Sequence, residues 1–132
     1  GYAARWNSNG LYLIYAAENC SLACLENLVH RNGFGNDSDY SLLTISFPIT
    51  IKTIEIYSKD LPKDWNNATE NGHLICRTIG DTWIRNQKSA ILFVPSAIIP
   101  NEKNVLINPN HPDFKKIKFA TQPFAFDKRL AK

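Results

Sequence analysis

Hydrophobic and polar positions repeat with two different periods along this chain, and the two periods separate helices from strands. Between residues 17 and 31, apolar side chains recur at three- and four-residue spacing, which places them on one face of a helix: Leu22, Leu25, Leu28 and Val29. Asn19 or Ser21 can cap the start of this helix, and Asn32-Gly33 predicts its end.

A second helix is predicted over residues 73–87. Its apolar side chains also have helical spacing: Leu74, Ile75, Ile79, Trp83 and Ile84. Gly80 interrupts the pattern, and a glycine inside a helix costs about 1 kcal/mol relative to alanine. Its presence indicates that another part of the chain packs closely against the helix at this point.

Short apolar runs predict the strands. They cover residues 11–16, 42–47, 49–57, 90–94, 105–107, 116–119 and 123–126. The first of these is expected to be buried, and 49–57 is expected to pair with 42–47 as a hairpin or meander. With 132 residues and no repeat or linker, the chain is predicted to be one compact α+β domain over residues 1–132. It should hold a small mixed β-sheet and two main helices.

Composition narrows the classes of protein that fit. The net charge of +3 is mildly basic and does not by itself argue for nucleic acid. No apolar run approaches the roughly 18 residues that span a bilayer. Three cysteines without CxxC or HxxxH spacing favour a reducing, cytoplasmic compartment and predict no metal site. The chain begins at Gly1 and contains no methionine, so residues upstream of it are expected.

No general catalytic motif is present, and the candidates for chemistry are single residues. Glu26 lies at the rim of the first apolar stripe, where it is either a solvated edge residue or a positioned carboxylate. Arg5 is a surface cation or a fork for a pyrophosphate. Tyr15 is a core residue or a platform for a planar ring. Together, these three side chains suit a dinucleotide whose N-glycosidic bond is cleaved through an oxocarbenium-like state.

Ser96 and Asn108 follow predicted strands. Ser96 comes after Pro95, where a serine usually serves a turn but can also hold a polar ligand. Asn108, like His111 after it, reads first as a turn former. Asp81 on the second helix is interpreted as a structural residue. His30 is interpreted as a cation that interacts favourably with the helix dipole at the C-terminal end of the first helix.

The order of short motifs resembles the RES-domain family, the toxins of RES/Xre toxin–antitoxin pairs. The matching pieces run in family order over almost the whole chain: Ala4-Arg5-Trp6-Asn7, residues 13–18, residues 22–30, Ile79-Gly80-Asp81-Thr82-Trp83, Val94-Pro95-Ser96-Ala97, residues 106–114 and residues 124–130. Each piece is short, and it is their shared order that carries the resemblance.

This resemblance implies an ADP-ribosyltransferase-like fold and NAD⁺ as the substrate, cleaved between nicotinamide and ribose by phosphorolysis or hydrolysis. Some family members instead transfer ADP-ribose to a protein. The family's Arg, Glu and Ser correspond to Arg5, Glu26 and Ser96, with Tyr15 as the aromatic partner. Arg5, Tyr15 and Glu26 are expected to be catalytic, and Arg5, Tyr15, Ser96 and Asn108 to bind the substrate.

The same resemblance implies a partner, an antitoxin with an Xre-type helix-turn-helix region that covers the toxin's pocket. A homodimer of the toxin within that complex is a further expectation, with no membrane and no direct contact with nucleic acid. The family normally has a strand and loop before the arginine motif, so this chain is expected to lack its N-terminal strand.

Two readings from other classes of protein remain open at the level of sequence. Small basic toxins often bind or cleave RNA, and six lysines lie near aromatic residues: Lys52, Lys59, Lys63, Lys115, Lys116 and Lys118. A steep salt dependence of RNA binding would favour that reading. The chain could also be a catalytically inactive interaction module.

Overall fold

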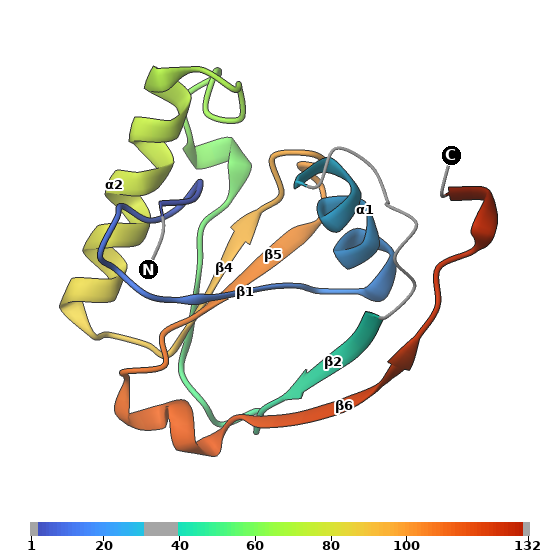
Figure 1. The fold of residues 1–132 in the computed structure, drawn as a ribbon. Coiled ribbons are helices and arrows are strands. Elements are labelled where there is room, and N and C mark those ends of the chain that lie inside the picture. The colour runs from blue at the N-terminus through green and yellow to red at the C-terminus, as the bar shows by residue number, and fades with distance from the viewer. Residues whose placement is uncertain (1–2, 31–39, 131–132) are drawn as a thin grey trace.

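The structure, a computed structural model, describes residues 3–30 and 40–130. Its centre is a four-stranded sheet in the order β1-β5-β4-β3 (Figure 1). β5 runs antiparallel to β1 and β4, whereas β3 and β4 are parallel. The strands are β1 (Ile14–Ala17), β3 (Thr53–Glu55), β4 (Ile91–Pro95) and β5 (Lys103–Ile107). A mixed sheet with two α-helices in the described residues confirms the α+β prediction.

Helix α2 (Glu70–Asn86) packs on one face of this sheet. Thr69 caps it by accepting the N–H of Gly72, and Gln87 ends it in the left-handed conformation. The shared core holds Trp6, Leu13, Trp65, Cys76, Trp83, Ile84, Leu92, Val94 and Leu106. The helix predicted over residues 73–87 is therefore confirmed. It begins earlier than predicted, at Glu70, because its polar first turn carries no apolar pattern.

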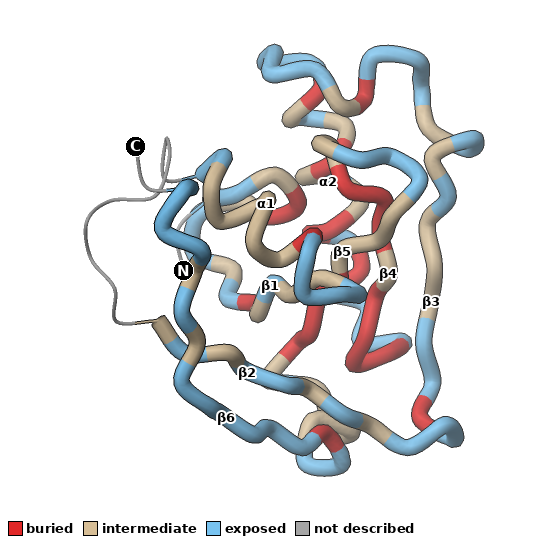
Figure 2. Tube along the Cα trace, turned by 90° about the vertical axis from the view of Figure 1, so that its right-hand side faces the viewer, coloured by how far each residue is buried: buried red, intermediate tan, exposed pale blue. Residues whose placement is uncertain are grey.

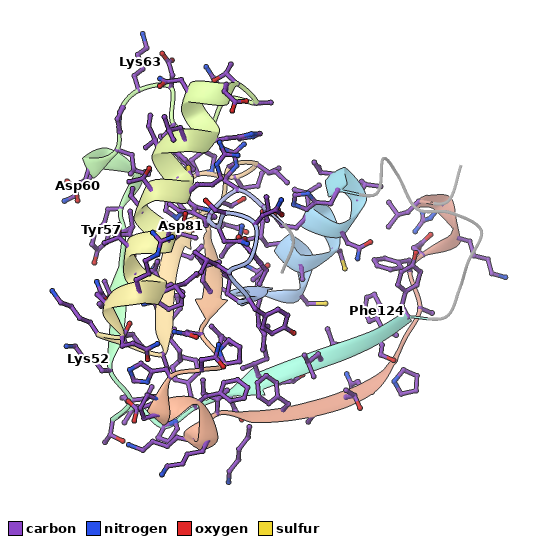
Figure 3. The ribbon with its side chains drawn as sticks, turned by 60° about the vertical axis from the view of Figure 1, so that its left-hand side comes forward. Lys52, Tyr57, Asp60, Lys63, Asp81 and Phe124 are labelled. Atoms are coloured by element: carbon purple, nitrogen blue, oxygen red, sulfur yellow. The ribbon has the colours of Figure 1, made fainter. Side chains whose placement is uncertain are left out.

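The close approach predicted at Gly80 is confirmed. A Cβ atom added at Gly80 would overlap the carbonyl oxygen of Trp6. The next residue, Asp81, accepts hydrogen bonds from the N–H (2.9 Å) and the hydroxyl of Ser8. Asp81 is labelled on α2 in Figure 3. Two neighbouring residues of α2 thus hold the segment that contains Arg5, and the structural reading of Asp81 is confirmed.

The opposite face of the sheet packs on a second core cluster: Ile51, Ala90, Ile91, Val105, Ile107 and Ile117. Here a two-stranded ribbon of β2 (Tyr40–Ser46) and β6 (Lys118–Phe124) leaves the body of the domain. Figure 2 shows this ribbon mostly exposed or half-buried, in contrast to the buried strand β4. Ile45 packs against the second core cluster and so anchors the ribbon to the sheet.

Two strand predictions were wrong about pairing. Residues 49–57 do not form a hairpin with β2, since only Thr53–Glu55 is a strand and it pairs parallel with β4. The two closing strands are one, β6, which contains Pro123 opposite Ser41. A proline is tolerated there because both strands of a two-stranded ribbon are edge strands with one unpaired side.

Helix α1 (Cys20–His30) begins where Asn19 accepts the N–H of Leu22 at 2.8 Å. The predicted apolar stripe is not a buried face, because within α1 only Leu22 is buried, and Val29 is 48% exposed. The strand before it, β1, is a half-buried edge strand and not the buried strand expected. The helix end predicted at Asn32-Gly33 lies outside the described residues.

Candidate active site

A cavity of about 430 Å³ opens between the N-terminal segment, β1, α1 and the β4–β5 connection. Arg5, Tyr15 and Glu26, which lie far apart in sequence, all line it. Small or apolar side chains make up most of the rest: Ala4, Trp6, Ala16, Ala17, Ala23, Val29, Ala97 and Ile98, with His30 and Asn104. Ligand pockets commonly combine a mainly apolar wall with a few converging polar groups.

A second cavity of about 250 Å³ lies beside β3 and the β4–β5 connection. It is lined by the ion pair of Lys103 and Glu55, whose nitrogen and oxygen are 3.1 Å apart. None of the five predicted site residues lines it. The larger cavity is therefore the candidate active site.

The carboxylate of Glu26 is held in place through one of its two oxygens. Its Oε1 accepts hydrogen bonds from the Ser96 hydroxyl and from the Asn104 amide nitrogen, both at 2.8 Å. Its Oε2 lies 3.3 Å from Nε2 of His30, one turn further along α1. The Glu26 side chain is 18% exposed and the His30 side chain 74% exposed, so Oε2 lies next to an exposed side chain whereas Oε1 is held by Ser96 and Asn104.

Ser96 is fully buried directly after β4, and the chain bends over the residues that follow it. Its hydroxyl oxygen accepts the N–H groups of Ile98 and Ile99, each at 3.1 Å, while its hydrogen points to Glu26. Ser96 thus shapes the β4–β5 connection and holds the carboxylate. These contacts agree with the turn reading of Ser96. Because Ser96 does not line the cavity and its hydroxyl is already bonded to Glu26, the expected contact with the substrate is corrected to a contact with the carboxylate.

Arg5 is half-buried and reaches the cavity from the N-terminal segment. Its Nη1 donates to the carbonyl oxygen of Trp65 at 3.1 Å and lies 3.9 Å from Sγ of Cys76. Burial raises the pKa of the Cys76 thiol, and the nearby guanidinium acts in the opposite direction. The hydrogen bond to Trp65 restrains the guanidinium, whose planar fork can bind an anion through two nitrogens.

Tyr15 presents its ring to the cavity and ties its hydroxyl to the N-terminal segment. The hydroxyl donates to Oδ1 of Asn7 and accepts the N–H of Trp6 at 3.2 Å. Burial of the hydroxyl raises the pKa of Tyr15 above its ordinary value, and the Trp6 hydrogen bond opposes this in part. Tyr15 is therefore a neutral, oriented aromatic group at neutral pH.

Asn108 does not line the cavity. It follows the opposite end of β5 from Asn104, a separation of roughly 13 Å at the rise of a strand. Its Oδ1 accepts the N–H of Asn110, and its own N–H donates to Ala90. The expected substrate contact is thus corrected to a turn, because strand β5 carries Asn108 away from α1.

His111 completes that turn. Its Nδ1 accepts the N–H of Asp113 at 3.0 Å, and its Nε2 lies 2.9 Å from the carbonyl oxygen of Gln87. It therefore caps the short helix η2 (Pro112–Lys116) and joins it to the end of α2. The turn reading of His111 is confirmed.

Two residues of the site were not foreseen in these roles. Asn104 lies two positions before the buried Leu106, so it shares that residue's face of β5. A polar residue on the buried face of a strand was the available signal. His30 was read only as a helix-end cation, although a four-residue separation on one helix places it beside Glu26.

Comparison with known proteins identifies the family of the chain. The sequence profile described as "RES domain" matches residues 1–128. The chain belongs to the RES domain family. RES relatives include a protein named "Prs ADP-ribosylating toxin" from a Sphingobium species, 40% identical over 116 residues, or 86% of this chain and 71% of the relative. "Toxin Res" of Yersinia enterocolitica is 38% identical, and the match covers 98% of this chain and 84% of the relative.

A third RES relative, "Toxin Res" of Photorhabdus laumondii, is 39% identical over 99% of this chain and 83% of the relative. These matches confirm the resemblance seen in the motifs. In the described part of the chain, no helix combines the length and apolar character that crossing a membrane requires. Residues 3–30 and 40–130 also hold no group of three or more side chains arranged to bind a metal ion.

Proposed function

We propose that this RES domain is a toxin enzyme that cleaves the bond between nicotinamide and ribose in NAD⁺. The observation that carries the proposal is the Glu26 carboxylate, held through Oε1 by two donors at 2.8 Å in the cavity that Arg5 and Tyr15 also line. A cavity of about 430 Å³ falls within the range of roughly 300–1,000 Å³ that is usual for small-molecule sites.

In the proposed reaction, the bond from the ribose C1′ to the ring nitrogen breaks and its electron pair leaves with neutral nicotinamide. Positive charge develops on the ribose, and a fixed carboxylate stabilises such an oxocarbenium-like state. Oε2 of Glu26 is the oxygen placed to accept a ribose hydroxyl, because Oε1 is already bonded twice. A nucleophile then forms the new bond at C1′.

The other site residues bind and orient in this proposal. Arg5 holds the pyrophosphate with the guanidinium nitrogens that Trp65 does not engage. Tyr15 packs its neutral ring against the nicotinamide end. Ser96 acts through Glu26, because its hydroxyl hydrogen is directed to Oε1 and its oxygen to two backbone N–H groups.

The test is NAD⁺ consumption by the purified protein and by Glu26→Gln. We expect the variant to lose about 10²–10³-fold in kcat, as is usual when a group that stabilises transition-state charge is removed. Glu70→Gln, which changes an exposed glutamate on α2, is the matched control and should retain full activity. Equal rates for Glu26→Gln and the parent would refute the assignment.

The acceptor divides the proposal into three forms. A rate that requires inorganic phosphate, with ADP-ribose 1″-phosphate as product, supports phosphorolysis, and a rate independent of phosphate supports hydrolysis. Transfer of ADP-ribose to a protein is the second candidate, and the name of the Sphingobium relative favours it. Labelling of a cell extract with biotinylated NAD⁺ would reveal it, provided that the label is absent with Glu26→Gln.

We further propose a protein antitoxin of the Xre helix-turn-helix type as the partner, since relatives bear the name of a toxin. The rim of the cavity offers the exposed Val29 and His30 on α1 for such a contact. Co-purification with the product of an adjacent Xre-type gene, together with loss of NAD⁺ consumption in the complex, would support this. A complex with undiminished activity would contradict coverage of the site.

A further inference from the structure

We infer that Asn104 is a positioning residue of the active site, which holds Oε1 of Glu26 so that Oε2 faces the substrate. The inference rests on the NAD⁺ cleavage proposed above. Asn104 belongs to none of the motifs through which the chain resembles its family. It nevertheless donates to Glu26 at 2.8 Å, the same distance as Ser96.

The backbone under Asn104 is held on both sides. β5 lies between β1 and β4, and the Cα of Asn104 is paired with Ala17 on one strand and with Val94 on the other. Ser96 follows β4, and its N–H donates to the carbonyl oxygen of Glu102. Both donors therefore extend from adjacent strands of one sheet, and a rigid base of this kind fixes a functional group more precisely than a loop does.

The second polar atom of Asn104 indicates why an asparagine stands here. Its Oδ1 is buried and has no hydrogen-bond partner among the residues that the structure describes. A buried acceptor without a partner destabilises a fold, so stability alone would favour an apolar side chain of similar size. The amide nitrogen bonded to Glu26 supplies the reason for keeping the residue.

Replacing Asn104 tests the positioning of Glu26 with less disturbance of the local fold than replacing Ser96 would cause. The Ser96 hydroxyl accepts two backbone N–H groups of the β4–β5 connection, so its removal disturbs that connection as well as Glu26. The Asn104 side chain, in contrast, donates its hydrogen bond to Glu26. Replacing Asn104 should therefore change catalysis without a comparable loss of stability.

The experiment measures kcat, KM and thermal stability for Asn104→Leu and Asn104→Asp beside the parent. Leucine removes both the donor and the unpaired acceptor, so we expect an unchanged or higher Tm with a kcat lower by about 10- to 100-fold. KM should change by less than about threefold, because the lost interaction acts on the transition state. Aspartate keeps the shape and places a second carboxylate against Glu26, so kcat should fall at least as far.

Ser89→Ala is the control variant, for which we expect the opposite effects on stability and on kcat. Ser89 is fully buried, bonds Trp83 and the backbone of Ile91, and does not line the cavity. This variant should lose stability and retain the kcat of its folded fraction. A kcat loss in Asn104→Leu that merely followed a fall in Tm would overturn the inference, and so would an unchanged kcat in both Asn104 variants.

An activity-independent measurement distinguishes this inference from the proposed function. We expect the side-chain amide protons of Asn104, observed by NMR, to exchange with solvent at least about tenfold faster in Glu26→Ala than in the parent. Equal exchange rates would overturn the inference even if NAD⁺ is consumed. A parent protein that leaves NAD⁺ intact would refute the proposed function and the catalytic role of Asn104 together, while the exchange rates would still report whether Asn104 holds Glu26.

Discussion

At the scale of single residues, the two oxygens of Glu26 have different surroundings. Ser96 and Asn104 bind Oε1, whereas Oε2 lies on the side of the exposed His30. Tyr15 shows a similar division, with its hydroxyl bonded inside the protein and its ring in the cavity. Both side chains are therefore held by hydrogen bonds within the protein and also line the cavity.

Because the hydroxyl of Tyr15 is buried inside the protein, it should lose its proton only at a higher pH than an ordinary tyrosine does. Its pKa is raised in the folded protein because burial favours the neutral form. The stability that this group contributes is complete below the ordinary tyrosine pKa of about 10 and is lost as pH rises above it. Tyrosinate absorbance should reveal the group as a difference between the parent and Tyr15→Phe.

That difference should appear only above pH of about 10. Tyr12→Phe, which changes a tyrosine that is 59% exposed, controls for the loss of one chromophore. If the Tyr15 difference titrates at or below the ordinary value, its hydroxyl is not buried in the way the structure indicates.

At the scale of elements, α2 positions Arg5, the arginine proposed to bind the pyrophosphate, although α2 contributes no residue to the cavity wall. Gly80 lies against the backbone of Trp6, and Asp81 binds Ser8. Trp6 itself packs on Trp65 with ring centroids 6.1 Å apart. These contacts with α2 and with Trp65 hold the N-terminal segment in place, and they therefore set the position of Arg5.

Gly80→Ala tests this fastening. Alanine favours a helix by about 1 kcal/mol over glycine, but its methyl group would overlap Trp6. We expect a net destabilisation of about 1–3 kcal/mol, the usual cost of overpacking, and a raised KM for NAD⁺ because Arg5 moves. Urea unfolding and steady-state kinetics measure the two effects.

Thr82→Ala is the control on an exposed position of the same helix and should change stability little. A Gly80→Ala protein as stable as the parent would show that α2 and the N-terminal segment are not in close contact.

At the scale of the whole molecule, the positive charge is spread over several surfaces. Figure 3 shows Lys63 at the top of the molecule, in the loop before α2, and Lys52 near the lower end of the same side. Lys118 begins β6, and Lys103 is paired with Glu55. A net charge of +3 is mildly basic and does not by itself indicate a surface that binds nucleic acid.

Salt should separate the two classes of ligand. Raising salt from about 50 to about 200 mM weakens binding that depends on many phosphate contacts by orders of magnitude. We expect any RNA retention to disappear over this range, while the KM for NAD⁺ changes by less than about threefold. RNA cleavage that persists at the higher salt and survives Glu26→Gln would place the activity in the nucleic-acid class.

The sequence by itself determined the local elements and the family. Helical spacing marked α2, Asn19 was among the proposed caps of α1, and the apolar run at β4 was found nearly to the residue. The order of short motifs is sufficient to indicate the RES domain, and the family match over residues 1–128 confirms it. These features depend on neighbours within a few positions, and local propensity and capping act at that range.

Tertiary structure alone decided which strands pair and which side chains meet. The parallel pairing of β3 with β4 and the antiparallel pairing of β2 with the distant β6 both depend on burial across the whole chain, so the hairpin predicted for residues 49–57 is wrong. Asn104 belongs to no motif, and the sequence predicts a ligand contact at Asn108 instead. Asn104 lies on β5 and Asn108 directly follows it, but only the end of the strand beside α1 reaches Glu26. Position along one strand, which residue type does not reveal, separates the active site from a turn.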